Sequence, residues 1–169
     1  MSCGCQLRER NLIMSKQITI KDIEPIRVAY KSYKGNVLEA GKHMPSIFKS
    51  IKGKNNGTPF FCIYQVDETT GIGELDLCIP TMEEPSSQEV FVKEMPRIQA
   101  VSITHTGSYD TLPLSYQLLF AYIAENNLKV IGPCREVYIK GPGPILKGNP
   151  DNYITEILLP INYSTGAGD

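Results

Sequence analysis

The sequence lacks an excess of charge of either sign, a long apolar run and any tryptophan. Its 169 residues carry 17 Lys and Arg against 18 Asp and Glu, which gives a formal net charge of −1. Nucleic-acid binding calls for a clustered basic face, so we expect no direct nucleic-acid binding. No apolar stretch approaches the roughly 20 residues that span a bilayer, and residues 1–10 lack the apolar segment of a secretory signal. These absences predict a cytoplasmic protein that does not enter a membrane.

Signals for metal binding and for disulfides are also sparse. The 5 cysteines are an odd number, and without a secretory signal they predict reduced thiols. Cys3 and Cys5 form a close pair, but no second pair and no nearby histidine completes a set of four ligands. We therefore expect neither a metal site nor a cofactor.

Apolar spacing and turn residues predict the order strand, helix, strand, strand twice along the chain. The first set comprises a strand over 23–35, a helix capped by Asn36 and interrupted at Pro45, and strands over 59–66 and 72–80. The second set comprises a strand over 97–105, a helix capped by Asp110 or Thr111, and strands over 133–140 and 153–161. We interpret this pattern as an internal duplication. It predicts an α+β fold in which two units form a pseudo-twofold antiparallel sheet, with helices on one face and a ligand groove at the junction.

The same reading sets the domain boundaries. Residues 23–162 form one domain, with halves 23–81 and 90–162 joined by a polar linker over 82–89. We expect residues 1–22 to be a partly disordered leader and residues 163–169 to be a disordered tail. Met14 offers an alternative start, which leaves open whether residues 1–13 belong to the native protein.

One carboxylate, Glu156, stands in a strand that otherwise consists of apolar and β-branched residues. A buried carboxylate is costly unless a partner, a proton or a ligand compensates it. Residues opposite each other in an antiparallel hairpin follow from the position of the loop. With the loop centred near residue 147, Tyr138 faces Glu156, and Glu136 faces Leu158 on the same side of the sheet.

Loop position also predicts the register of the first hairpin. There Tyr64 faces Asp76, and Cys62 faces Cys78. Each half thus has a tyrosine opposite a carboxylate.

Tyr33 and His105 occupy equivalent places in the two halves, each two residues before a glycine. We expect them at the rim of the groove, with a structural role at the strand end as the alternative.

A carboxylate and phenols in an apolar groove attract organic cations by charge and by cation–π contact. The same groups suit proton chemistry, with Tyr138 as the acid and Glu156 as the base. The simplest alternative is that each tyrosine is merely hydrogen-bonded to its carboxylate and holds the hairpin together.

Three segments together resemble a known family: HTGSY over 105–109, GPCREVYI over 132–139 and YITEILLPI over 153–161. They resemble the GyrI-like effector-binding domain, which occurs at the C-termini of AraC-type and MerR-type multidrug-responsive regulators and also as free-standing proteins. The resemblance covers residues 23–162. Residues 1–22 are too few for a helix-turn-helix, so we do not expect the chain itself to be a transcription factor.

The resemblance implies a duplicated fold with a ligand groove between the halves. In regulators of the family a buried glutamate in the groove contacts cationic aromatic drugs, and Glu156 matches that position. Some free-standing relatives resemble hydrolases of electrophilic small molecules that use a glutamate and a tyrosine, here Glu156 and Tyr138. Those relatives tend to use aromatic bulk in the groove, whereas this chain has no Trp. Other relatives inhibit DNA gyrase by protein contact.

The residues and the resemblance together predict a stand-alone protein that binds apolar, cationic or aromatic small molecules. A cofactor-free hydrolase using Glu156 and Tyr138 is the first alternative, and a protein that contacts DNA gyrase or a regulator is the second. The residues expected to contact the ligand are Glu156, Tyr138, Glu136, Tyr64, Asp76, Tyr33 and His105.

Overall fold

A 9-stranded antiparallel sheet organises the chain, which the computed structural model describes over residues 18–142 and 148–162. In chain order the elements are β1 (Ile18–Ile23), β2 (Ile26–Asn36), η1 (Val37–His43), α2 (Met44–Ser50), β3 (Phe60–Val66), β4 (Ile72–Pro80), β5 (Phe91–Met95), β6 (Ile98–Thr106), η2 (Tyr109–Thr111), α3 (Leu112–Glu125), β7 (Lys129–Val130), β8 (Cys134–Lys140), η3 (Pro150–Asn152) and β9 (Ile154–Asn162). Residues 18–22 were expected in the leader but form part of β1. The expected tail and residues 1–17 lie outside the described residues.

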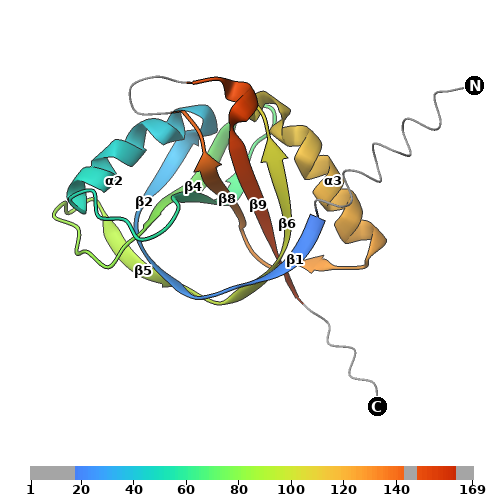
Figure 1. The fold of residues 1–169 in the computed structure, drawn as a ribbon, viewed down its shortest axis with the longest axis horizontal. Helices are drawn as coiled ribbons and strands as arrows, with labels where there is room; N and C mark the ends of the chain where they lie inside the picture. The colour runs from blue at the N-terminus through green and yellow to red at the C-terminus, as the bar shows by residue number, and fades with distance from the viewer. Residues whose placement is uncertain (1–17, 143–147, 163–169) are drawn as a thin grey trace, which may run out of the picture.

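Neighbouring strands in the sheet follow the order β1-β6-β9-β8-β3-β4-β2-β5, and the short β7 pairs with β9. The sheet curls, and α2 and α3 lie at its two sides with β8 and β9 running between them (Figure 1). The centre of the sheet is therefore the β3–β8–β9 region, where the two strand-helix-strand-strand sets meet.

Both helices cover the same face of the sheet. One row across that face runs from Phe61 through Glu136 to Ile157 and Ile103. Phe61 belongs to the core under α2, whereas Ile157 and Ile103 belong to the core under α3. Two apolar cores thus lie side by side, and residues of β8 occupy the boundary between them.

The first helical segment begins and divides where the sequence predicts. Asn36 caps η1, because its side-chain oxygen accepts a hydrogen bond from the Leu38 amide at 2.9 Å. Pro45 lies in the first turn of α2, where its missing N–H leaves no intrahelical bond unmade. The predicted interruption at Pro45 is confirmed, since η1 ends and α2 begins beside it.

The second helical segment has a different cap from the predicted one. Ser108 caps η2 by accepting a hydrogen bond from the Asp110 amide at 3.1 Å, whereas Thr111 makes no side-chain cap bond at the start of α3.

Strand-helix-strand-strand order occurs twice, from β2 to β4 and from β6 to β9, with β7 as an addition. The predicted α+β class with an antiparallel sheet is confirmed by this architecture. The internal duplication and its pseudo-twofold axis stay predictions, because repeated element order does not by itself test them. Among the described helices, none combines the length and apolarity needed to cross a membrane.

The register of the second hairpin differs by one residue from the predicted one. Tyr138 pairs with Thr155, and Val137 pairs with Glu156. The predicted register does hold next to the loop, where Lys140 pairs with Ile154, but an irregularity between Tyr138 and Lys140 shifts it. A shift of one residue reverses the face to which each side chain points. Tyr138 and Glu156 therefore lie on opposite faces of the sheet, and their predicted pairing is wrong.

The first hairpin differs from its predicted register by two residues. Val66 pairs with Gly73 next to the loop, one residue from the prediction, and an irregularity between Ile63 and Gln65 adds the second shift. Cys62 therefore faces Asp76, and Cys78 faces Phe60 instead of Cys62. Tyr64 lies at this irregularity and still donates a hydrogen bond to Asp76 at 2.7 Å.

Candidate ligand-binding site

Glu136 occupies the boundary between the two cores. It lies on β8 between Phe61 of β3 and Ile157 of β9, on the face that the helices cover. Its position follows from strand alternation, which directs Cys134, Glu136 and Tyr138 to one face of β8. The sequence analysis included Glu136 among the ligand-contacting residues, but as a companion of Glu156.

Two phenols donate hydrogen bonds to the Glu136 carboxylate. The Tyr138 hydroxyl contacts Oε2 at 2.6 Å, and the Tyr116 hydroxyl reaches Oε1 from helix α3. Among the described residues, no lysine, arginine or histidine forms an ion pair with Glu136. The carboxylate is thus held in place by neutral donors, and no cation of the described part of the chain forms an ion pair with it.

Aromatic rings extend from this carboxylate along the boundary. Tyr138 meets Phe61 edge to face with ring centroids 4.7 Å apart, and Tyr109 approaches Tyr138 at 5.9 Å. Tyr109 also lies 5.2 Å from Tyr153. We call Glu136 and these four tyrosines the Glu136 cluster: Glu136, Tyr109, Tyr116, Tyr138 and Tyr153.

The hydroxyls of Tyr138 and Tyr116 stay protonated at neutral pH, because the pKa of each is raised. Burial raises the pKa of Tyr138 well above its ordinary value, and the nearby Glu136 charge raises it further. Burial likewise raises the pKa of Tyr116, with Cys134 and Glu136 adding to the effect. These hydroxyls can therefore act as hydrogen-bond donors to the carboxylate or to a ligand.

A polar atom without a partner lies beside the cluster. Thr155 is fully buried opposite Tyr138, and its Oγ1 has no hydrogen-bond partner among the described residues. A buried hydroxyl in this state costs free energy unless something else satisfies it.

Glu156 lies on the opposite face and is compensated there. Its Oε1 accepts a hydrogen bond from the Ser102 hydroxyl at 2.7 Å and forms an ion pair with Lys21 of β1. The structure therefore does not bring Glu156 together with Tyr138 or Glu136. The sequence analysis did not anticipate Lys21 as a partner because it assigned residues 18–22 to the leader.

Asp76 is also compensated by protein groups. It is 5% exposed and accepts hydrogen bonds from Ser32 at 2.6 Å and Tyr64 at 2.7 Å. Lys93 forms an ion pair with it while lying 4.2 Å from the Tyr30 ring centroid. Burial alone would raise the pKa of Asp76, but Lys93 and the two hydroxyls outweigh burial and lower it.

The two residues expected at the rim are engaged locally. His105 is buried, with Nδ1 2.7 Å from the Ser115 hydroxyl and Nε2 3.0 Å from the Ser108 carbonyl oxygen. Tyr33 donates to the Asn36 carbonyl at 2.9 Å and packs against His43. These contacts tie strand ends to the helices that follow and do not involve Glu136.

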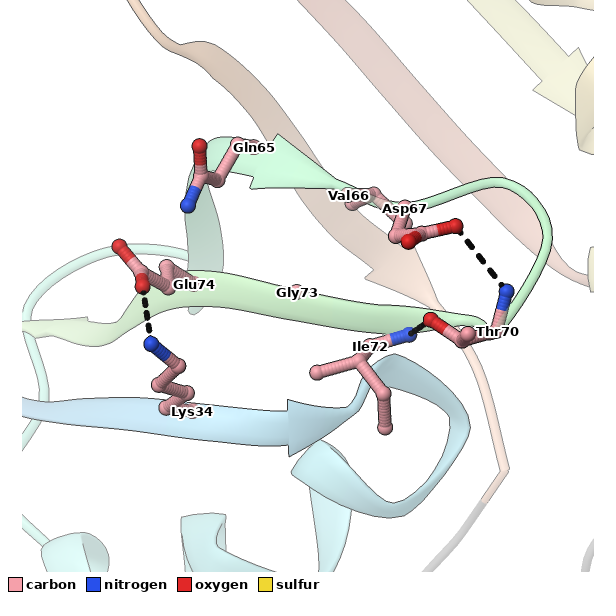
Figure 2. Close-up of a pocket in the computed structure, with 8 residues that line it drawn as sticks. All are labelled: Lys34, Gln65, Val66, Asp67, Thr70, Ile72, Gly73 and Glu74. Carbon is pink, nitrogen blue, oxygen red and sulfur yellow. Dashed lines mark hydrogen bonds and ion pairs between the residues drawn. The ribbon is translucent and has the colours of Figure 1, made fainter.

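Two surface hollows lie near the β3–β4 hairpin. The larger, about 610 Å³, is lined by Lys34, Gln65, Val66, Asp67, Thr70, Ile72, Gly73 and Glu74. Figure 2 shows that its polar side chains are directed at one another, with Lys34 paired to Glu74 and Asp67 bonded to the Thr70 amide. The smaller, about 280 Å³, includes Ser32, Tyr64 and Asp76 in its lining. The sequence analysis named neither hollow.

Tyr109, Tyr116 and Tyr153 are the cluster members that the sequence analysis did not select. Tyr116 lies in the second predicted helix, and Tyr109 and Tyr153 lie inside the segments that resemble the family. The alternation of Glu136 and Tyr138 along one strand was the available signal, because it places a phenol and a carboxylate on one face whatever the register.

Comparison with known proteins defines the class to which this curled sheet and its two helices belong. The model of the GyrI-like small molecule binding domain matches residues 16–162. The chain therefore belongs to the GyrI-like family. Among curated proteins, none matches this chain.

Three solved structures illustrate the shared fold. The EcmrR C-terminal domain has 22% sequence identity and a TM-score of 0.74, covering 86% of this chain and 97% of that one. SAV2435 bound to tetraphenylphosphonium has 14% identity and a TM-score of 0.57, covering 86% and 94%. A hydrolase encoded by lin2189 from Listeria innocua has 11% identity and a TM-score of 0.63, covering 92% and 97%. At these identities the likeness concerns the fold alone.

Proposed function

We propose that the chain binds apolar organic cations at the Glu136 cluster. The observation that carries the proposal is a contrast between three carboxylates of the central sheet. Asp76 is paired with Lys93 and Glu156 with Lys21, whereas Glu136 has only phenols as partners among the described residues. A bound cation would supply the positive charge beside Glu136 that lysines supply beside Asp76 and Glu156.

The surroundings of Glu136 suit a cation with an aromatic body. Four tyrosines and Phe61 offer ring faces and edges for dispersion and cation–π contact. Thr155 Oγ1 offers a further polar contact that no described residue uses. Membership of a small-molecule-binding family supports the proposal, as does a structural relative whose structure holds tetraphenylphosphonium.

Substitution Glu136→Gln should weaken binding of tetraphenylphosphonium by about tenfold or more, because it removes the charge while keeping the size and shape of the side chain. Isothermal titration at pH 7 measures the affinity. Glu156→Gln is the matched control, since it makes the same chemical change on the opposite face and should leave the affinity unchanged. Equal affinities for wild type and Glu136→Gln would overturn the proposal, and loss confined to Glu156→Gln would restore Glu156 as the binding carboxylate.

Hydrolysis of electrophilic small molecules is a second candidate for the same cluster. The observation that favours it is the 2.6 Å hydrogen bond between Tyr138 and Glu136, which joins a proton donor to a carboxylate base. Glu156 cannot take this role beside Tyr138, because the two lie on opposite faces.

If the cluster is catalytic, turnover of an isothiocyanate should fall about a hundredfold in Tyr138→Phe, since general acid catalysis contributes that much or more. Spectrophotometric loss of the isothiocyanate measures it. Background rates for the wild-type protein would rule out hydrolysis of this substrate class. The predicted contact with DNA gyrase or a regulator stays a prediction, because no described feature bears on it.

A further inference from the structure

Arg135 precedes Glu136 on β8 and therefore points to the opposite face of the sheet. There it is a buried cation, whereas Glu136 is a carboxylate. Arg135 is 3% exposed and lies between Cys62 of β3 and Leu158 of β9. Its guanidinium carbon is 5.7 Å from the centroid of the Phe60 ring. A cation is therefore buried among apolar and sulfur-containing side chains at the centre of the sheet.

Apart from the Phe60 ring, no described residue compensates this cation. Arg135 Nε has no hydrogen-bond partner, and none of the ion pairs among the described residues includes Arg135. An arginine does not lose its proton in proteins, so it cannot escape the cost of burial by becoming neutral.

The titratable groups around Arg135 are neutral at pH 7. They are the thiols of Cys62 and Cys78 and the phenol of Tyr64. Burial raises the pKa of each of these groups, so none of them carries the negative charge that the guanidinium needs.

The acidic groups of this face are already in use. Asp76 is occupied by Lys93, Ser32 and Tyr64, and Glu156 is occupied by Lys21 and Ser102. Because Asp76 and Glu156 are each paired with a lysine, Arg135 is an unpaired positive charge among the described residues of this part of the face.

Tyr64 is the surface residue among the groups around Arg135. It is 52% exposed and lines the hollow of about 280 Å³.

We propose that Arg135 anchors a second binding site, for a small organic monocarboxylate, on the face of the sheet opposite the helices. A guanidinium matches a carboxylate through two parallel hydrogen bonds, and one carboxylate neutralises the one unpaired charge. Phe60, Val137 and Leu158 on the same face favour a ligand with an apolar body. A phosphate dianion fits less well, because Arg135 is the one unpaired cation among the described residues around this site and the surrounding thiols are weak donors.

The test is a thermal-shift titration with benzoate and hexanoate at pH 7, with benzamide and inorganic phosphate as matched probes. Both carboxylates should raise the melting temperature of the wild-type protein in a saturable manner, and benzamide and phosphate should not. No saturable shift with either carboxylate, or a shift produced by phosphate alone, would overturn the proposal.

Variants assign the effect to the guanidinium. Arg135→Met should abolish the response and melt no lower than the wild-type protein without ligand, because it removes an uncompensated buried charge. Arg135→Lys keeps the charge but loses the two parallel N–H donors of the guanidinium, so the affinity for the carboxylates should fall by about tenfold. If Arg135→Met fails to fold, Arg135→Lys provides the test in its place. Arg97→Gln, at an exposed arginine paired with Glu24, is the control and should respond like the wild type. A response in Arg135→Met or Arg135→Lys equal to that of the wild type would overturn the proposal.

The carboxylate site uses other residues than the cation site and lies on the other face of the sheet. Without a cation present, Glu136→Gln should still bind the carboxylates in a saturable manner, so that failure of either proposal leaves the other testable.

Discussion

At the scale of single residues, the central sheet shows three ways of treating a carboxylate. Asp76 is buried and fully engaged by a lysine and two hydroxyls. Glu156 is partly buried and engaged by a lysine and one hydroxyl. From the residues that the structure describes, Glu136 accepts only phenolic hydrogen bonds. Because burial of charge is costly, the first two arrangements serve stability, and the third is the one expected at a site of binding.

The Asp76–Lys93 pair makes stability depend on pH. The pKa of Asp76 is lowered from 3.8 in the folded state, so its contribution to stability is present above that value and is lost as the pH falls through the lower folded pKa. Asp76→Asn should therefore lower the free energy of unfolding at pH 7 by about 3 kcal/mol, the cost of leaving one partner of a buried pair alone.

Urea denaturation at pH 7 and at pH 2 measures this effect. The difference between wild type and Asp76→Asn should shrink at the lower pH, where the wild-type carboxyl is increasingly protonated. Glu74→Gln breaks the exposed Lys34–Glu74 pair and should leave the transition almost unchanged. A difference for Asp76→Asn that is independent of pH would show that packing, and not charge, is responsible.

At the scale of elements, the sequence predicts the two helical segments and the strands of both hairpins well, does not predict β1, β5 or β7, and predicts strand register poorly. Apolar spacing, the Asn36 cap and Pro45 locate the first helical segment, and the strands of both hairpins begin and end within a few residues of the predicted bounds. Periodicity and capping are local properties, which is why they can be recognised without the fold.

Register fails because each hairpin contains an irregularity that loop position does not reveal, and in the first hairpin the pairing next to the loop is also one residue from the predicted one. Because of the shift between Tyr138 and Lys140, Glu156, the carboxylate predicted to face Tyr138, lies on the other face of the sheet. What the sequence does preserve is the alternation within one strand, so that Glu136 and Tyr138 share a face regardless of register. The predicted set of residues thus contained two members of the Glu136 cluster, while the residue chosen as its centre, Glu156, lies elsewhere.

At the scale of the whole molecule, the two cores determine where a site can lie. Each helix covers its own part of the curled sheet, and β8 runs along the boundary between those parts (Figure 1). The residues at this boundary come from segments far apart in the chain, such as Tyr116 of α3 and Phe61 of β3. Such a meeting depends on the topology of the sheet, which is why Tyr116 could not be selected from the sequence.

Arg135 and Glu136 are adjacent on β8 and place opposite charges on opposite faces of the sheet. The affinities for the two proposed ligands should therefore depend on each other. A cation at Glu136 and an anion at Arg135 would lie on the order of 10 Å apart with one strand between them, where opposite charges attract by about 1 to 2 kcal/mol at an effective dielectric constant near 20. The two ligands should therefore show positive heterotropic linkage, each raising the affinity of the other by the same factor of about tenfold.

Titration of tetraphenylphosphonium in the presence and absence of saturating benzoate measures that factor. Arg135→Met should remove the linkage and keep cation binding, which separates coupling through the protein from ion pairing between the ligands in solution. Identical dissociation constants with and without benzoate in the wild-type protein would contradict the linkage. If the linkage is observed, the single strand β8 separates two sites that are coupled electrostatically through the sheet, so that a ligand on one face raises the affinity of the other face for its own ligand.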